Sequence, residues 1–206
     1  MPTSVQITDR LYCILATAIA STDNEQLSRT ELDSHANMPV VGMNCTILRQ
    51  HGRTVDVRPF TPDYAPMLIP LVDAAVLYQC PFSGEEYIFI IMNALHVPSM
   101  QNNLISPFII RDVGTQVKET PKIQCAEPDE SDHDITFDAN LRVPLYLHGI
   151  FSYFTTSKPT VDQIESIEDV YLLTPESFNP HDVAYSLNEE SMLDWKGNMV
   201  DKRDRQ

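Results

Sequence analysis

Residues 31–37 read ELDSHAN and lie between a polar stretch and a longer apolar one. Within them Asp33 is followed by a short hydroxyl residue, Ser34, then by His35 and by the small Ala36. An acidic residue in such a loop can act in acid–base chemistry, and the small side chain allows another backbone to approach closely. Matches of four residues are common, so the interpretation depends on the segments around this loop.

The composition restricts the classes of function. The chain has 206 residues, enough for one domain with an appendage or for two small domains. Its 29 Asp and Glu outnumber 14 Lys and Arg, for a formal net charge of -15, which argues against direct nucleic-acid binding because phosphates require gathered basic residues. The 15 Pro, many in short apolar segments, predict a β-rich fold with rigid turns.

Two interpretations of the apolar run at residues 11–20 stay open. A signal peptide fits its shape, but Asp9 and a single basic residue, Arg10, precede it, so we favour a buried first strand or short helix. The run is shorter than the about 20 apolar residues that a membrane span needs. We therefore expect a cytoplasmic protein with no membrane partner.

Residues 67–79 and 87–97 are two long apolar stretches, and CPFSGEE lies between them as a turn. Their β-branched and aromatic residues predict a hairpin. A turn is expected around Gly52, followed by an alternating segment with Val55 and Val57 on one face. Residues 102–114 suggest a short helix that begins at an Asn N-cap and ends near Gly114.

Three segments in fixed order are similar to a known family. ELDSHAN (31–37), NALHVPSMQNNLIS (93–106) and PFIIRDVG (107–114) resemble the retropepsin-like aspartic protease region of copia-type LTR retrotransposon Gag-Pol polyproteins. Those regions carry an LDSGA-like loop, then a strand ending in VLYVP, then NLLS and a short helix. The resemblance covers residues 31–114, and the second segment is its most specific part.

The resemblance implies a fold and a set of roles. The fold would be mostly β, a retropepsin-like closed barrel that forms half of a dimeric aspartic protease, with one short helix and a C-terminal extension. Asp33 matches the catalytic aspartate, Ser34 the residue that braces two loops, and Ala36 the small position. The segment from Leu104 through Ile105 to Ser106 matches the element that supports the catalytic loop from behind.

The flap that covers the substrate should lie within residues 54–71. Its predicted residues are Pro59, Phe60, Thr61, Pro62, Asp63 and Tyr64. We divide the chain into an N-terminal segment (1–28), a retropepsin-like domain (29–114) and an extension (115–206), which would be partly ordered with a disordered tail.

The expected activity is hydrolysis of peptide bonds in the parent polyprotein by a homodimer. Two copies of Asp33 would share one proton and activate a water, so a single loop per chain requires two chains. His35 stands where the family has Gly, whose missing side chain lets substrate pass close by. The alternative is therefore an inactive transposon-derived remnant or interaction domain, and a secreted acidic protein is a third possibility.

Other candidate sites are weaker. Residues 131–134, SDHD, could bind a metal, but acids around one His within an acidic run are more typical of a solvated loop. The four cysteines, at positions 13, 45, 80 and 125, lie far apart and predict no zinc site. There is no phosphate-binding glycine loop. Hydrolysis by a water between paired aspartates needs neither a metal nor an organic cofactor, so we expect none.

Overall fold

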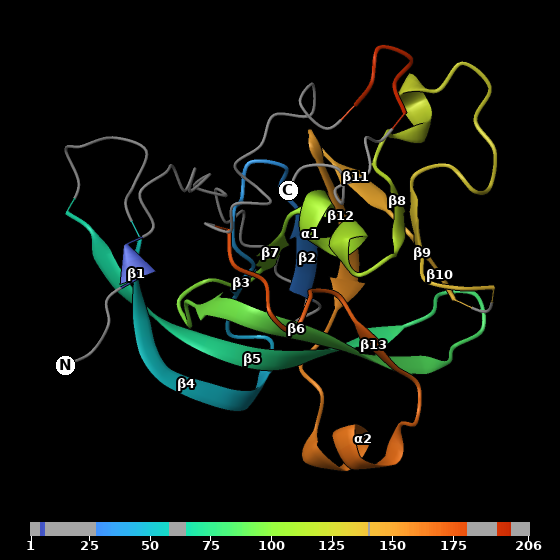
Figure 1. Ribbon diagram of the computed structural model, residues 1–206. Helices are drawn as coiled ribbons and strands as arrows, with labels where there is room; N and C mark the ends of the chain where they lie inside the picture. The colour runs from blue at the N-terminus through green and yellow to red at the C-terminus, as the bar shows by residue number, and fades with distance from the viewer. Residues whose placement is uncertain (1–4, 7–27, 58–64, 140, 181–192, 199–206) are drawn as a thin grey trace.

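The computed structural model describes residues 5–6, 28–57, 65–139, 141–180 and 193–198 (Figure 1). The predicted mostly β composition is confirmed, with two short α-helices. The larger sheet has the strand order β1-β4-β5-β6-β3-β7-β2-β12-β11, with β13 also paired to β6. Its strands are β1 (Val5–Gln6), β2 (Ser28–Leu32), β3 (Val40–Val41), β4 (Thr46–Val57), β5 (Met67–Gln79), β6 (Glu86–His96), β7 (Asn103–Ile105), β11 (Tyr146–His148), β12 (Phe151–Thr156) and β13 (Val170–Leu172).

The predicted apolar hairpin is confirmed. Strands β5 and β6 are antiparallel and pair from Leu71 opposite Leu95 to Gln79 opposite Glu86, with one shift of register between Val72 and Ala74. The turn that joins them contains Gly84 at a φ of 77°, a left-handed conformation in which glycine has no steric cost. Most of β5 is buried, which is why the segment lacks a polar face in the sequence.

The predicted turn at Gly52 is wrong. Strand β4 runs through this position without reversing, and its pairing with β5 shifts register between Gln50 and Thr54. Gly52 has a φ of 67°, so it belongs to a bulge, where the same conformational freedom is needed. The predicted alternation beyond it is confirmed, because Val55 and Val57 are both buried.

Strand β7 lies between β2 and β3 in the middle of the larger sheet. Its residue Leu104 pairs with Glu31 of β2 in parallel and with Val40 of β3 in antiparallel orientation. The helix α1 (Pro107–Asp112) follows, with Pro107 in its first turn, where a proline is tolerated. The predicted Asn N-cap is wrong: Ser106 is the N-cap, because β7 uses the preceding residues for strand pairing.

The segments after Gly114 continue the same sheet. Strand β12 is antiparallel to β2 on the side away from β7, and β13 is parallel to β6. A second, three-stranded sheet has the order β10-β9-β8. It consists of β8 (Gln116–Lys118), β9 (Asp134–Thr136) and β10 (Arg142–Pro144).

The main apolar cluster joins both halves of the chain. Phe89 of β6 and Phe154 of β12 are fully buried, with ring centroids 6.0 Å apart in an edge-to-face arrangement. Leu141 and Val143 belong to the same cluster, so the apolar residues after Gly114 pack against the strands before it. The division at Gly114 stays a prediction, since pairing and packing cross it.

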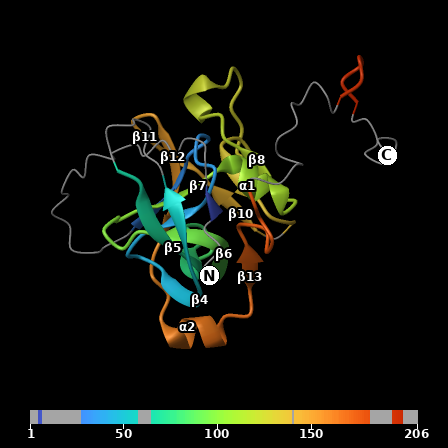
Figure 2. The same cartoon turned by 60° about the vertical axis from the view of Figure 1, so that its left-hand side comes forward.

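Two short helical elements lie at opposite ends of the molecule (Figures 1 and 2). The helix α2 (Val161–Ser166) begins at Thr160 with a capping box to Gln163. The 3-10 helix η1 (Lys122–Gln124) lies at the other end, near the loop that follows β2. In the described part of the chain, no helix is long and apolar enough to cross a membrane. Residues 11–20 and 199–206 lie outside the described residues.

Candidate functional site

The Asp33 loop begins where β2 ends, and β7 fixes its position. Leu32 pairs with Ile105, and the Asp33 N–H donates to the Ile105 carbonyl at 3.0 Å. The Ala36 N–H donates to the Asp33 carbonyl at 3.2 Å and closes a tight turn. The predicted supporting segment is therefore in contact with the loop that it was expected to support.

The Asp33 carboxylate lines a pocket. Its side chain is 8% exposed, and Oδ1 accepts a hydrogen bond from the His35 N–H at 2.9 Å. The pocket has a volume of about 240 Å³. It is lined by Glu31, Leu32, Asp33, Ser34, His35, Leu104, Ile150 and Phe151. A carboxylate in this setting can meet a bound molecule while the sheet shields its other side.

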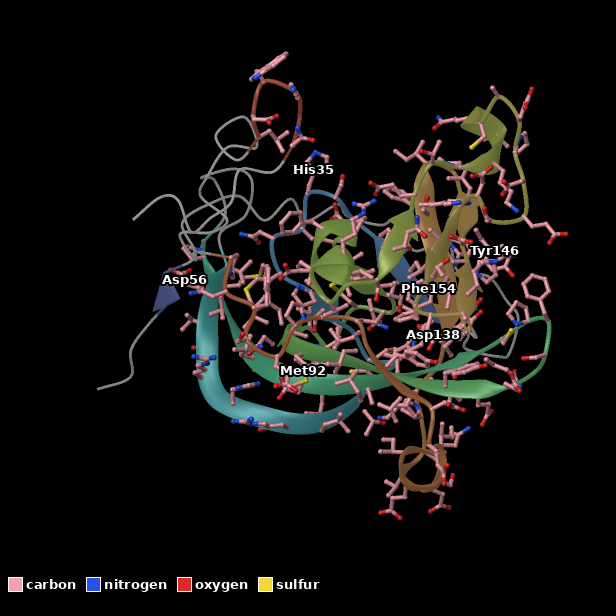
Figure 3. The ribbon with its side chains drawn as sticks, turned by 45° about the vertical axis from the view of Figure 1, so that its right-hand side comes forward. His35, Asp56, Met92, Asp138, Tyr146 and Phe154 are labelled. Carbon is pink, nitrogen blue, oxygen red and sulfur yellow. The ribbon has the colours of Figure 1, made fainter. Side chains whose placement is uncertain are left out.

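The His35 imidazole lies at the tip of the loop and points away from the sheet (Figure 3). Its side chain is 67% exposed, and Nδ1 is 4.0 Å from Asp33 Oδ1 and 3.3 Å from Ser34 Oγ. Among the described non-glycine residues, only Asn93 and His133 have a positive φ. The backbone at position 35 therefore does not require glycine, and the loop accommodates an imidazole without strain.

The other predicted support residues differ in burial. Ala36, Ile105 and Ser106 are buried, as close packing of the loop requires, and Leu104 lines the pocket. The Ser34 hydroxyl is bonded to His35 of its own loop, so its expected role as a brace between two chains stays a prediction.

All of the predicted flap residues fall outside the described residues. Positions 59–64 are not described. The strands on either side are described and form an antiparallel pair, from Thr54 opposite Pro70 to Val57 opposite Met67. A hairpin therefore exists where the flap was expected, and the identity of its tip as a flap stays a prediction.

Sequence reasoning missed Glu31, which lines the same pocket two residues before Asp33. It is 8% exposed, and Oε1 accepts a hydrogen bond from Asn102 Nδ2 at 2.8 Å. Burial raises the pKa of the Glu31 carboxyl above its ordinary value, against a lowering by Arg29 and Asn102. The period-two spacing of Glu31 and Asp33 along a strand was the signal that could have identified it.

The C-terminal segment also contributes to the site, which no motif predicted. Ile150 and Phe151, at the turn between β11 and β12, line the pocket beside Asp33. A second pocket, of about 460 Å³, adjoins the first through Leu32, Ser34 and Ile150. Its far wall includes Ile123 of η1, so the two pockets form a groove between the loop and the extension.

Within the described ranges, no group of three or more His, Cys, Asp or Glu could hold a metal ion. The acidic run is less solvated than expected at its end. His133 is buried and its Nε2 lies 2.8 Å from Ser152 Oγ, and the buried Asp134 lies 3.4 Å from Arg142. Both side chains therefore belong to the packing around β9 and β12.

Comparisons with family models, with curated proteins and with solved structures give no match for this chain. The functional assignment consequently depends on the sequence resemblance and on the geometry of the Asp33 loop.

Proposed function

We propose that this chain is an aspartic endopeptidase of retropepsin-like type, which cleaves peptide bonds of its parent polyprotein as a homodimer. The observation that carries the proposal is the support of the Asp33 loop: Asp33 N–H bonds to Ile105, and its carboxylate opens onto a pocket. An acidic residue that served only for solubility would have no reason to be buried at the end of a central strand.

The chemistry requires a second carboxylate. One Asp33 would accept a proton from a water held between the two, while the other, protonated, would polarise the scissile carbonyl. Two such groups in contact cannot both ionise, so the pair holds one proton on the acidic side of neutral. The second Asp33 would come from another copy of the chain across a two-fold axis.

Two features support a retropepsin-like barrel and a second copy. Leu77 of β5 and Ser157 exchange backbone hydrogen bonds of 2.8 and 2.9 Å, so the chain just beyond β12 returns to β5 across the larger sheet. Beside the loop, Ile123 and Ile150 are 81% and 86% exposed. Exposed apolar residues of this size next to the proposed axis are what a partner subunit would cover.

The variant Asp33→Asn tests the proposal. We expect it to lower cleavage of a polyprotein-junction peptide by about 10²–10⁴-fold or more, because the amide cannot take up the water's proton. Asp169→Asn, an exposed change near α2, is the matched control and should cleave like the wild type. Circular dichroism of both variants should be unchanged, and pepstatin-type inhibitors should block the wild type.

The alternative is a remnant that keeps the fold without cleavage. The imidazole of His35 favours it, because the ring lies within 4.0 Å of the Asp33 carboxylate where the family has no side chain. Under this alternative the wild type cleaves no peptide. The variant His35→Gly, which removes the imidazole beside Asp33, restores measurable cleavage. If neither the wild type nor His35→Gly cleaves the peptide, the proposed endopeptidase activity is excluded.

A further inference from the structure

We propose that Glu31 makes the pocket beside Asp33 selective for a basic side chain, Lys or Arg, of the peptide that lies in the site. The inference rests on the proposed function and deepens it by naming the substrate class. Its geometric basis is that one pocket holds two carboxyl groups with different surroundings. Asp33 lies in the loop next to His35, whereas Glu31 lies within β2, opposite Leu104 of β7.

The Glu31 carboxylate is held in place through one of its two oxygens. Asn102 Nδ2 donates to Oε1 at 2.8 Å, and Asn102 is itself held because its Oδ1 accepts the Arg29 N–H at 3.3 Å. Among the described residues, no hydrogen bond is donated to Oε2. A side chain that is nine-tenths buried and lines a pocket thus keeps one charged acceptor oxygen for a ligand.

The nearest cation of the chain does not take that oxygen. The Arg29 guanidinium lies 4.6 Å from the centre of the Tyr153 ring, a cation–π arrangement. Within the described residues, Arg29 forms no ion pair with Glu31 at 4.0 Å or less. Tyr153 is the cross-strand partner of Glu31, so the stacking holds Arg29 beside the carboxylate without neutralising it by contact.

The walls of the pocket match the rest of a basic side chain. Leu104 and Phe151 are apolar and can cover the methylene stem, while the carboxylate receives the charged head. The volume of about 240 Å³ is below the about 300–1,000 Å³ typical of whole small-molecule sites, so it suits one side chain. An acidic side chain would meet Glu31 and Asp33 together and would be repelled.

Four groups face Glu31, and they set the pH at which selectivity is lost. Burial raises the pKa of Glu31, Arg29 and Asn102 lower it, and His148 and Asp33 add smaller opposing effects. The ordinary pKa is 4.5, so protonation begins at a higher pH than for an exposed Glu. The preference for basic over uncharged side chains should therefore weaken as the pH falls towards that range.

The test compares peptides that differ at one position. Junction peptides with Lys, Arg, Met or Glu at each residue flanking the scissile bond are cleaved by the wild type, by Glu31→Gln and by Glu165→Gln. Gln at position 31 keeps the oxygen that accepts from Asn102 and removes the charge. Glu165 is exposed on α2, at the end of the molecule away from the loop, so its change matches the charge without touching the pocket.

We expect the wild type and Glu165→Gln to favour Lys or Arg over Met by at least about tenfold at one flanking position, and Glu31→Gln to lose that preference. If the wild type cleaves without this preference, or if the preference persists in Glu31→Gln, the inference is overturned. The proposed endopeptidase activity is not affected by either result. If the wild type cleaves nothing, fluorescence anisotropy of the same peptides decides. Binding that favours Lys or Arg and depends on Glu31 supports the pocket alone, and equal or absent binding refutes it.

Discussion

At the scale of single residues, Asp33 and Glu31 are two acids near the end of β2 with different surroundings. They are two positions apart, so both lie towards the same pocket. Asp33 accepts a backbone N–H from its own loop, whereas Glu31 accepts from the side chain of Asn102. The position of the loop acid is therefore set by the tight turn and by β7, and that of the strand acid by β7 and β12.

His133 provides a pH-dependent contact at the same scale. Its ring is buried against Ser152, and burial lowers its pKa below 6.5. Because the folded state favours the neutral ring, His133 contributes its full stabilisation of the fold above pH 6.5. That stabilisation is lost as the pH falls from 6.5 through the lowered pKa of the folded state. The loss amounts to about 1.4 kcal/mol for each unit by which burial lowers the pKa.

His133→Asn should remove this pH dependence. Asn tolerates the left-handed backbone at a φ of 57°, so the change removes the titrating ring without adding backbone strain. Urea unfolding at pH 7 and pH 5.5, at one protein concentration, should show a larger loss of unfolding free energy for the wild type than for the variant. An equal loss in both would contradict the assigned cause.

Some of these residues were predictable and others were not. The contact between the Asp33 loop and Ile105 could be predicted, because the family resemblance implies a supporting segment behind that loop. The bond from Asn102 to Glu31 and the place of Phe151 in the pocket wall could not, because both depend on side-chain contacts between segments distant in the chain. The two residue types, an amide and an aromatic, are equally common in ordinary loops and cores.

At the scale of elements, the position of β7 depends on a close approach at Gly42. Its N–H donates to Asn103 Oδ1 at 2.9 Å, and the next residue, Met43, donates to the Met100 carbonyl at 2.8 Å. A Cβ at position 42 would lie 2.3 Å from the Met100 oxygen and 2.9 Å from the Asn102 oxygen. Both are backbone atoms, which cannot turn aside like a flexible side chain.

Gly42→Ala should therefore lower both stability and cleavage. We expect a loss of about 1–3 kcal/mol in the free energy of unfolding, because the segment before β7 must shift. Gly84→Ala is the comparison, since nothing lies within 4 Å of its Cβ position and its turn is remote from Asp33. That variant should keep its cleavage rate even where left-handed strain lowers its stability, and a normal rate in Gly42→Ala would contradict the account.

Strand patterns were reliable where a strand is buried or strictly alternating, as in β5, β6 and the end of β4. They failed at Gly52, because a glycine with positive φ serves a bulge as well as it serves a turn. They also failed at residues 102–106, where pairing on both sides of β7 outweighed a local helix signal. Long-range pairing is the information that a local pattern lacks.

At the scale of the whole molecule, the extension is part of the framework that positions the site. Strand β12 completes the sheet beside β2, and buried hydroxyls of Thr30 and Thr156 lie 2.9 Å apart across that pair. The sequence of residues 115–206 does not reveal that β12 pairs with β2, because a local pattern does not specify a distant strand partner. Cleavage should accordingly require the extension as well as the motif-bearing segment.

The central claim, that two copies of Asp33 act in one site, is tested most directly by mixing subunits. Wild type and Asp33→Asn are combined in equal amounts, allowed to exchange, and assayed at constant total protein. Random pairing leaves about one quarter of the dimers with two intact Asp33, so activity should fall to about one quarter of the unmixed wild type. A fall to one half, or full activity from a species that sediments as a monomer, would contradict a shared site.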